Sequence, residues 1–193
     1  MLCKSKQRGF SLLELLVSLV VFSIGLLGIA GLQIVSKQSS YEGQQRTIAS
    51  QVAYGMLESM RTNGSGIGVY VAAPNLGGGK MAGLPVSNCR DPNVPCSPAQ
   101  KAAHDLWYWE QMIDGVQEMG VEGSSGGVIM PTVCVDGPAG SVAGTYAVSV
   151  AWRGSVATSN PELSQCGAGT GQYGDTDEFR RVMTVTTFID PNF

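Results

Sequence analysis

The stretch RGFSLLELLVSLVVFSIGLLGIAGLQ, residues 8–33, decides the fold of the N-terminal part of this chain. Three cations lie among residues 4–8, and an apolar run then continues over residues 10–35 with Glu14 as its single formal charge. About 20 apolar residues in a helix are enough to cross a bilayer. The stretch therefore predicts a membrane-spanning helix that begins close to the N-terminus.

Gly9 is a small residue on the unusual side of the apolar run. An ordinary secretory signal carries its small-residue cleavage site after the apolar region. Cleavage after Gly9 would instead remove only residues 1–9 and leave the helix on the mature chain, beginning at Phe10. The alternative is an uncleaved signal anchor. In both cases the leading cations keep the N-terminus in the cytoplasm and send the rest of the chain outward.

Glu14 stands out because an ionised carboxylate inside an apolar helix costs a few kcal/mol unless it has a partner. Cleavage after Gly9 would create such a partner, the new α-amino group of Phe10, either in the same chain or in a neighbouring copy. The alternative is that Glu14 lies at the membrane interface among lipid headgroups. We favour the first interpretation, since intramembrane charges are usually functional.

The motif GFSLLELL, residues 9–16, resembles the class III signal peptide of type IV pilins and pseudopilins, and the likeness continues to about Thr62. This resemblance implies that a prepilin peptidase cuts after Gly9 and methylates the N-terminus of Phe10. It also implies that Glu14 guides the subunit into a filament. The resemblance further implies an inner-membrane assembly platform and other minor and major pilins as partners.

The continuation VSLVVFSIGLLGIAGLQ, residues 17–33, is most similar to the PilV-type minor pilins. One departure concerns proline, which many major pilins carry in the middle of this helix. Here the first proline is Pro74, and the corresponding region contains Gly25, Gly28 and Gly31 instead. Each glycine weakens a helix by about 1 kcal/mol without abolishing it, so the helix is expected to be continuous.

The domain organisation follows from these patterns. We expect a cleaved leader over residues 1–9, a transmembrane half-helix over 10–35, an amphipathic half-helix over 36–62 and a globular domain over 63–193. Apolar residues recur every four positions in the amphipathic half and need a packing surface. They are Ile48, Val52, Met56 and Met60, and the opposite face carries Gln44, Gln51, Glu58 and Arg61.

The globular domain is predicted to contain a helix followed by strands. Residues 63–96 are rich in Gly and Pro and are expected to form a loop. Ser97, Pro98 and Gln100 form a capping box for a helix that should end at about Met119. Alternating patterns then predict antiparallel strands over 127–136, 145–153 and 180–190. The fold class is therefore α+β, and the resemblance implies the type IV pilin fold, a long N-terminal helix packed on a small antiparallel sheet with an additional helix in the αβ region.

Five cysteines divide into one in the leader, Cys3, and four in the exported part, where disulfides persist. Four cysteines allow three pairings. The short loop CRDPNVPC favours Cys89–Cys96, which leaves Cys134–Cys166, and the resemblance to PilV-type proteins supports this choice. A zinc site is the alternative, but the chain lacks the close CxxC pairs typical of one.

Nothing in the sequence indicates catalysis or a cofactor. His104 is the only histidine, so no multi-histidine metal site or histidine-based triad is available. The glycines at 77–79 lack the lysine and the strand–helix context of a phosphate loop. Without the leader cations the chain keeps 9 basic against 15 acidic residues, which argues against nucleic-acid binding. We expect no enzyme activity and no metal site.

Two further segments leave alternatives open. The acidic residues of GDTDE, 174–178, supply too few oxygens for a typical calcium site, so a solvated loop is favoured. Trp107, Tyr108 and Trp109 could stack on a ligand, but core or interface packing is the more common use of aromatic residues.

The expected function is that of a minor pilin in a bacterial type IV pilus system, helping to prime or modify pilus assembly through helix packing. The main alternative is a pseudopilin of a type II secretion system. A DNA-uptake pilin and a single-pass membrane enzyme are weaker alternatives. The expected location is the inner membrane, with the C-terminal domain in the periplasm, and later the pilus at the cell surface.

Overall fold

A computed structural model describes residues 9–81, 83, 85, 87–116, 119–120, 123–124, 126–162 and 164–192. Residues 1–8 of the predicted leader, 1–9, therefore lie outside the described residues. The chain divides into two compact units, Met1–Tyr41 and Glu42–Phe193, each described by itself below. Helix α1, Leu12–Thr62, contributes to both.

In the first unit, α1 is apolar on every side. The large apolar side chains between Phe10 and Val35 are 49–84% exposed, because nothing among the described residues covers them. A helix that is hydrophobic all round must be buried in a membrane or in other protein. Within the described residues, α1 is the one helix that is long and apolar enough to cross a membrane.

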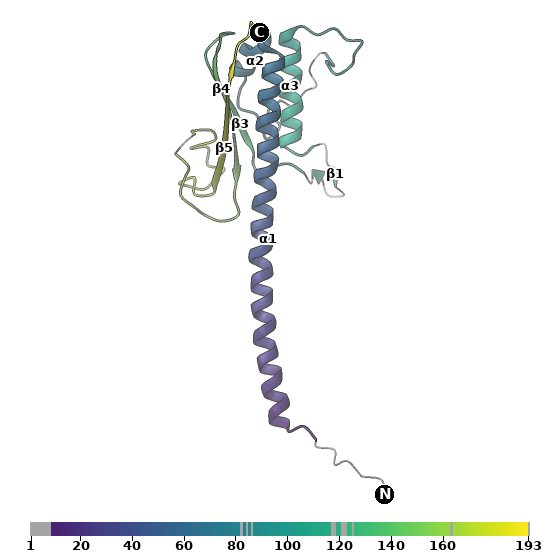
Figure 1. The fold of residues 1–193 in the computed structure, drawn as a ribbon, viewed down its shortest axis with the longest axis vertical. Helices are drawn as coiled ribbons and strands as arrows, with labels where there is room; N and C mark the ends of the chain where they lie inside the picture. Colours follow the sequence, from purple (N-terminus) through teal and green to yellow (C-terminus); the bar gives the residue numbers. More distant parts are fainter. Residues whose placement is uncertain are drawn as a thin grey trace. The chain divides into compact units, whose positions relative to one another are not determined.

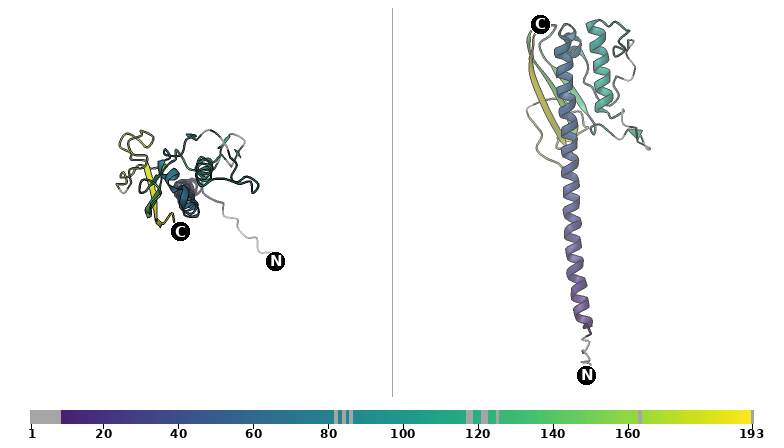
Figure 2. Two further views of the ribbon diagram at one scale, coloured as in Figure 1. Left: turned by 90° about the horizontal axis from the view of Figure 1, so that it is seen from above. Right: turned by 45° about the vertical axis from the view of Figure 1, so that its right-hand side comes forward.

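In the second unit, α1 lies between a sheet and helix α3, Pro98–Ile113 (Figures 1 and 2). The predicted stripe faces inward: Val52, Met56 and Met60 are at most 1% exposed, and Ile48 is half-buried. On the far side, Trp109 of α3 packs against Gly55, where a Cβ atom would lie 2.2 Å from the indole Cη2. The Trp109 Nε1–H also donates to Ser59 Oγ at 3.3 Å. This contact favours packing as the role of Trp109.

The main sheet has three antiparallel strands in the order β3–β4–β5. They are β3, Thr132–Asp136; β4, Gly144–Arg153; and β5, Arg180–Ile189. In register, Val133 pairs with Val150 and Val150 with Met183, so one face of all three strands points at α1. The α+β prediction and the three strands are confirmed.

Three sequence-based boundaries were wrong. Residues 63–96 were expected to be a loop, but they contain a 3-10 helix, Gly64–Gly66, and α2, Ile67–Ala72. Ile67 and Tyr70 are at most 1% exposed, so burial of these side chains stabilises a short helix in a glycine-rich segment. The sequence pattern did not reveal this tertiary packing.

Helix α3 ends at Ile113 rather than at about Met119. Gly115 adopts φ +71°, and a Cβ atom there would collide with the carbonyl of Gly126. The Val128 N–H then donates to Ile113 O at 2.9 Å, which caps the helix end with a returning chain. Met119 belongs instead to a two-stranded sheet of β1, Met119–Gly120, and β2, Gly123–Ser124.

Strand β3 begins at Thr132, not at 127. Met130 has a left-handed φ of +47°, and Pro131 follows it, so an extended ladder cannot begin earlier. The strand lies at one edge of the sheet.

Candidate functional site

Helix α1 starts with a side-chain cap. The Glu14 N–H donates to Ser11 Oγ at 3.2 Å, and the Leu15 N–H donates to Ser11 O at 3.2 Å. Ser11 thus occupies the N-cap position of a Ser-x-x-Glu pattern. Gly9 and Phe10 precede this cap as exposed, non-helical residues, and a Cβ atom on Gly9 would meet nothing within 4 Å. The described residues therefore leave space around Gly9.

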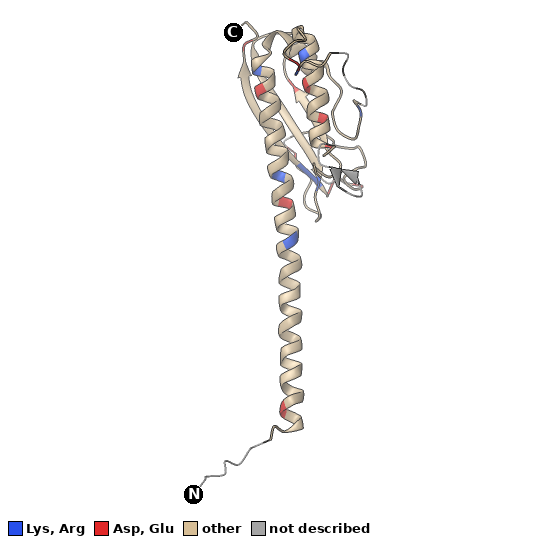
Figure 3. Ribbon diagram, turned by 90° about the vertical axis from the view of Figure 1, so that its right-hand side faces the viewer, with Lys and Arg blue, Asp and Glu red and all other residues tan. Residues whose placement is uncertain are grey.

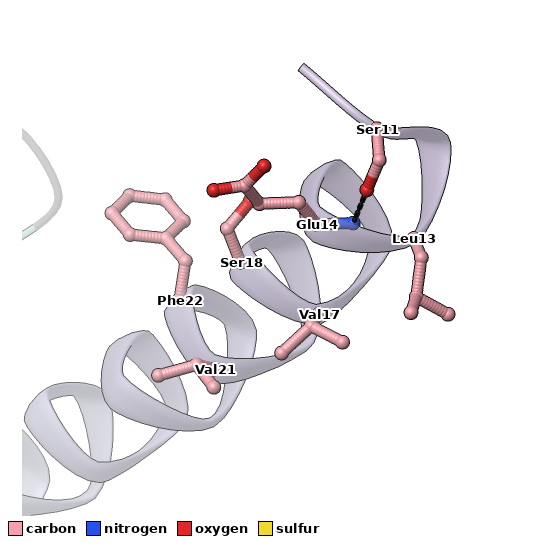
Figure 4. A pocket seen from close by; sticks show the side chains of 7 residues that line it. All are labelled: Ser11, Leu13, Glu14, Val17, Ser18, Val21 and Phe22. Carbon is pink, nitrogen blue, oxygen red and sulfur yellow. Dashed lines mark hydrogen bonds between the residues drawn. The ribbon is translucent and has the colours of Figure 1, made fainter.

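The Glu14 carboxylate is directed away from the cap. It lies on the side of Ser18 and Phe22, while Ser11 bonds only the backbone of Glu14 (Figure 4). The carboxylate forms no hydrogen bond or ion pair with any described residue. The helix N-terminus favours a negative charge nearby, but a partial dipole does not neutralise a full charge in an apolar medium.

Apolar side chains surround Glu14. Together with Ser11 and Ser18 they line an open surface hollow of about 700 Å³. The apolar lining residues are Leu13, Val17, Val21 and Phe22. A cation that reached Glu14 would therefore form its ion pair in largely apolar surroundings, where water screens the attraction less.

The remaining hydroxyls of this region are satisfied within the helix. Ser18 Oγ donates to Leu15 O at 2.8 Å, and Ser23 Oγ donates to Leu19 O at 2.7 Å. No other Lys, Arg, Asp or Glu occurs between Glu14 and Lys37 (Figure 3). Glu14 is consequently the one charged side chain in this stretch, and it needs a partner from outside the described residues.

The four cysteines that follow α1 form the disulfides Cys89–Cys96 and Cys134–Cys166, which are the pairs favoured by the sequence. Cys134 is on β3, and Cys166 belongs to the long segment between β4 and β5. Both are at most 8% exposed. The second disulfide therefore holds this segment against the sheet face that points away from α1.

Arg180 also organises the segment between β4 and β5, a role that sequence reasoning missed. Its side chain is 1% exposed and donates to four neutral oxygens rather than to a carboxylate. Nε–H donates to Asn160 Oδ1, Nη1 to the carbonyls of Ser164 and Cys166, and Nη2 to the carbonyl of Pro161. No local pattern reveals a guanidinium that binds a segment up to 20 residues away.

The glycines at 77–79 bind protein carboxylates rather than a phosphate. The N–H groups of Gly77 and Lys80 donate to Glu110 Oε1 at 2.9 and 3.0 Å. Asp114 accepts the N–H groups of Gly78 and Gly79, each at 2.9 Å. Glu110 is 0% exposed, although no pattern in the sequence indicates its burial. The contacts fix this loop to α3.

The acidic residues of 174–178 serve the local loop structure. Asp177 Oδ2 accepts the Gly169 N–H at 2.9 Å, and Glu178 accepts the backbone and hydroxyl of Thr176. Hydrogen bonds from the backbone of Glu178 and from Thr176 lower the pKa of the Glu178 carboxyl. Among the residues that the structure describes, no three His, Cys, Asp or Glu side chains gather as a metal site.

His104 is buried at 4% exposure and lies beside Trp107, with the ring centroids 5.9 Å apart and the ring planes tilted by 56°. Its environment is that of a packing residue. Tyr108 lies under Arg90, whose guanidinium carbon is 3.5 Å from the ring centroid. The aromatic residues of α3 thus have protein contacts of their own.

Two family models match the chain. The prokaryotic N-terminal methylation motif matches residues 4–30, and the type IV pilin Tt1218 model matches residues 31–107. Comparison with curated proteins and with solved structures gives no match. The long N-terminal helix with a small antiparallel sheet matches the type IV pilin fold. The chain thus carries the N-terminal methylation motif and resembles type IV pilins over residues 4–107 and in its fold.

Proposed function

We propose that this chain is a minor pilin of a bacterial type IV pilus system, inserted in the inner membrane and then packed into a pilus by its N-terminal helix. The observation that carries the proposal is the Glu14 carboxylate, which lies in an apolar helix four residues after Phe10 and has no hydrogen bond or ion pair with any described residue. The PilV-like sequence of residues 17–33 supports a minor rather than a major subunit.

The first step is processing. Residues 1–9 form the leader, which prepilin peptidase removes before the N-terminus of Phe10 is methylated. The cations of residues 4–8 keep this end in the cytoplasm, residues 10–35 span the membrane, and 36–193 lie on the periplasmic side. Methylation leaves the amine positively charged, so it can still pair with a carboxylate.

The second step is assembly. The apolar part of α1 moves from lipid into contact with other pilin helices. Its apolar side chains therefore never become exposed to water. Glu14 would then form an ion pair with the N-terminal ammonium group of a neighbouring subunit, since its own carboxylate is turned away from the start of its helix. An unpaired charge in the filament core would cost several kcal/mol, so this pair selects correctly docked subunits.

A pseudopilin of a type II secretion system is equally compatible with the motif and fold. The two roles differ in the filament that contains the chain. Deletion would reduce surface pili in the first case and protein secretion in the second. The family is a structural one, so we propose no catalytic role.

The test uses Glu14→Ala in the full chain. We expect normal leader removal and membrane insertion but little incorporation into pili, because the neighbouring amine loses its counter-charge. The matched control is Glu58→Ala, which removes an exposed carboxylate from the same helix. Wild-type incorporation of Glu14→Ala would contradict the pairing role.

Replacement of Gly9 by a bulky residue should block leader removal, and mature-size protein from that variant would contradict the cleavage site.

A further inference from the structure

Strand β5 forms an open edge of the sheet. It pairs with β4 along its whole length, and no described segment pairs with its other side. The opposite edge differs, since Leu76 bridges to Val133 of β3 with hydrogen bonds of 2.9 and 3.0 Å. An open edge presents unpaired N–H and C=O groups, which another extended chain can bind.

Burial along the sheet shows that β5 lacks a neighbour. On the face toward α1, Tyr146, Val148 and Val150 of β4 are 0% exposed. Their β5 partners Val185 and Met183 are only half-buried, although they face the same helix. A further strand beside β5 would cover these side chains.

The sequence of β5 lacks the usual protection of an edge. Residues 182–189 read VMTVTTFI, with no charge, proline or glycine. Natural edges are commonly blocked by lysine, proline or a bulge. A run of β-branched and aromatic residues without such a block is typical of strands that pair with another chain.

A basic groove adjoins the start of this edge. It has a volume of about 370 Å³, and Arg181 and Val182 of β5 line it together with Arg46 of α1. Arg46 forms no hydrogen bond or ion pair with the described residues. Arg181 donates to Thr158 Oγ1 and Val156 O, both neutral, so neither guanidinium faces a bound carboxylate.

The groove lining keeps a net positive charge, because its one carboxylate offsets only one of the two guanidinium groups. Glu42 is the one carboxylate in the lining, and it already accepts Ser155 N–H and Oγ–H at 2.6 and 2.9 Å. Trp152 also lines the groove, and its buried indole N–H lacks an acceptor among the described residues. The groove thus offers an acidic group the Arg46 guanidinium, which has no partner among the described residues, beside the second positive charge of Arg181.

We infer that the β5 edge and this groove form one docking surface for an extended segment of another pilin-like subunit. The segment adds to β5 as a strand, its apolar side chains cover Met183 and Val185, and a carboxylate near its end lies between Arg46 and Arg181. This inference rests on the proposed function, which supplies the class of partner.

A second copy of the chain fits this surface less well. Arg181 of β5 lies beside Arg46, and Pro191 just after β5 lies against Gly64, so β5 runs in the same direction as the outer part of α1. Copies anchored in one membrane can therefore join their β5 edges only in parallel. In register, that arrangement places Arg181 beside its own copy, and like charges in adjacent strands are unfavourable.

The test places a photoreactive benzoylphenylalanine at Thr186 of the full chain in the cells that produce it. Thr186 is exposed on β5, and the control position is Thr145, exposed on the central strand β4. We expect an adduct from Thr186 but not from Thr145, mapped by mass spectrometry to an extended segment with an acidic residue in a different pilin-like subunit.

Arg46→Glu should lower the adduct yield roughly tenfold, equivalent to about 1.4 kcal/mol. Arg61→Glu makes the same change on the same helix and should leave the yield unchanged, since Arg61 pairs with Glu58 and does not line the groove. No adduct, an adduct with a second copy, or a yield insensitive to Arg46→Glu would overturn the inference. Leader removal and membrane anchoring are measured in the same cells: if both are normal, such a result overturns the inference and leaves the proposed function intact.

Discussion

The two parts of α1 share one helical backbone but differ in what covers their apolar side chains. Before Tyr41 the apolar side chains surround the helix and remain uncovered. From Glu42 onward most apolar side chains form one buried stripe, and the exposed positions are mostly polar, with Tyr54 as an exception. The contrast teaches that helicity alone does not assign a role. The role of each part follows from what covers it. The chain's own sheet and α3 cover the outer part, whereas the apolar part needs lipid or other subunits.

The sharpest test of this contrast compares Met56→Ala with Leu19→Ala. Met56 is 1% exposed, so its truncation should destabilise the second unit by about 2–5 kcal/mol through lost burial and a cavity. Leu19 is 61% exposed in this chain, and its truncation should change the same unfolding free energy by less than about 0.5 kcal/mol. Urea unfolding of the full chain in detergent, followed by tryptophan fluorescence, measures both. Equal effects would contradict the contrast.

Glycines on α1 offer a second comparison with opposite signs. Alanine usually stabilises a helix by about 1 kcal/mol relative to glycine. Gly55→Ala should instead destabilise the second unit by about 1–3 kcal/mol, because the new methyl group would meet the Trp109 ring. Gly28→Ala meets nothing within 4 Å and should not lower stability. Thermal midpoints of the two variants check this. A stabilised Gly55→Ala variant would show that Trp109 of α3 does not pack closely against Gly55 of α1.

A smaller effect concerns alkaline pH and the second unit alone. Burial and the hydrogen bond from Tyr70 Oη–H to Asp105 Oδ2 raise the Tyr70 pKa, and burial also raises that of Tyr173. Because the unfolded chain then loses these protons first, stability should be full below about pH 10 and fall above it. Tyr70→Phe should flatten this fall, whereas Tyr54→Phe, at an exposed position, is the matched control. Urea midpoints from pH 8 to 11 measure the slope, and an unchanged slope in Tyr70→Phe would refute the assignment.

Much of the fold could be predicted because its signals are local. The apolar run, the Ser97 capping box and the alternating strand patterns each lie within a short window, and the structure contains α1, α3 and β3–β5 accordingly. The early end of α3 was missed because it depends on Gly115 meeting Gly126, a contact between two loops. Local periodicity carries no information about such contacts.

The candidate site divides in the same way. Glu14 could be identified because a lone charge in an apolar run is visible in the sequence itself. The roles of Glu110 and Arg180 could not be predicted, since their hydrogen-bond partners lie 14 to 33 residues away in the chain. Buried polar residues that bind backbone groups look like ordinary surface residues in a sequence.

The central claim is that Gly9–Phe10 is a processing site that provides the cation for Glu14. The most direct measurement is the mass of the N-terminal peptide of the chain purified from the membranes of its own cells. The account predicts a peptide that begins with N-methylated Phe10. A peptide that retains residues 1–9 would contradict it, because Glu14 would then have no neighbouring N-terminal amine at its depth in the membrane.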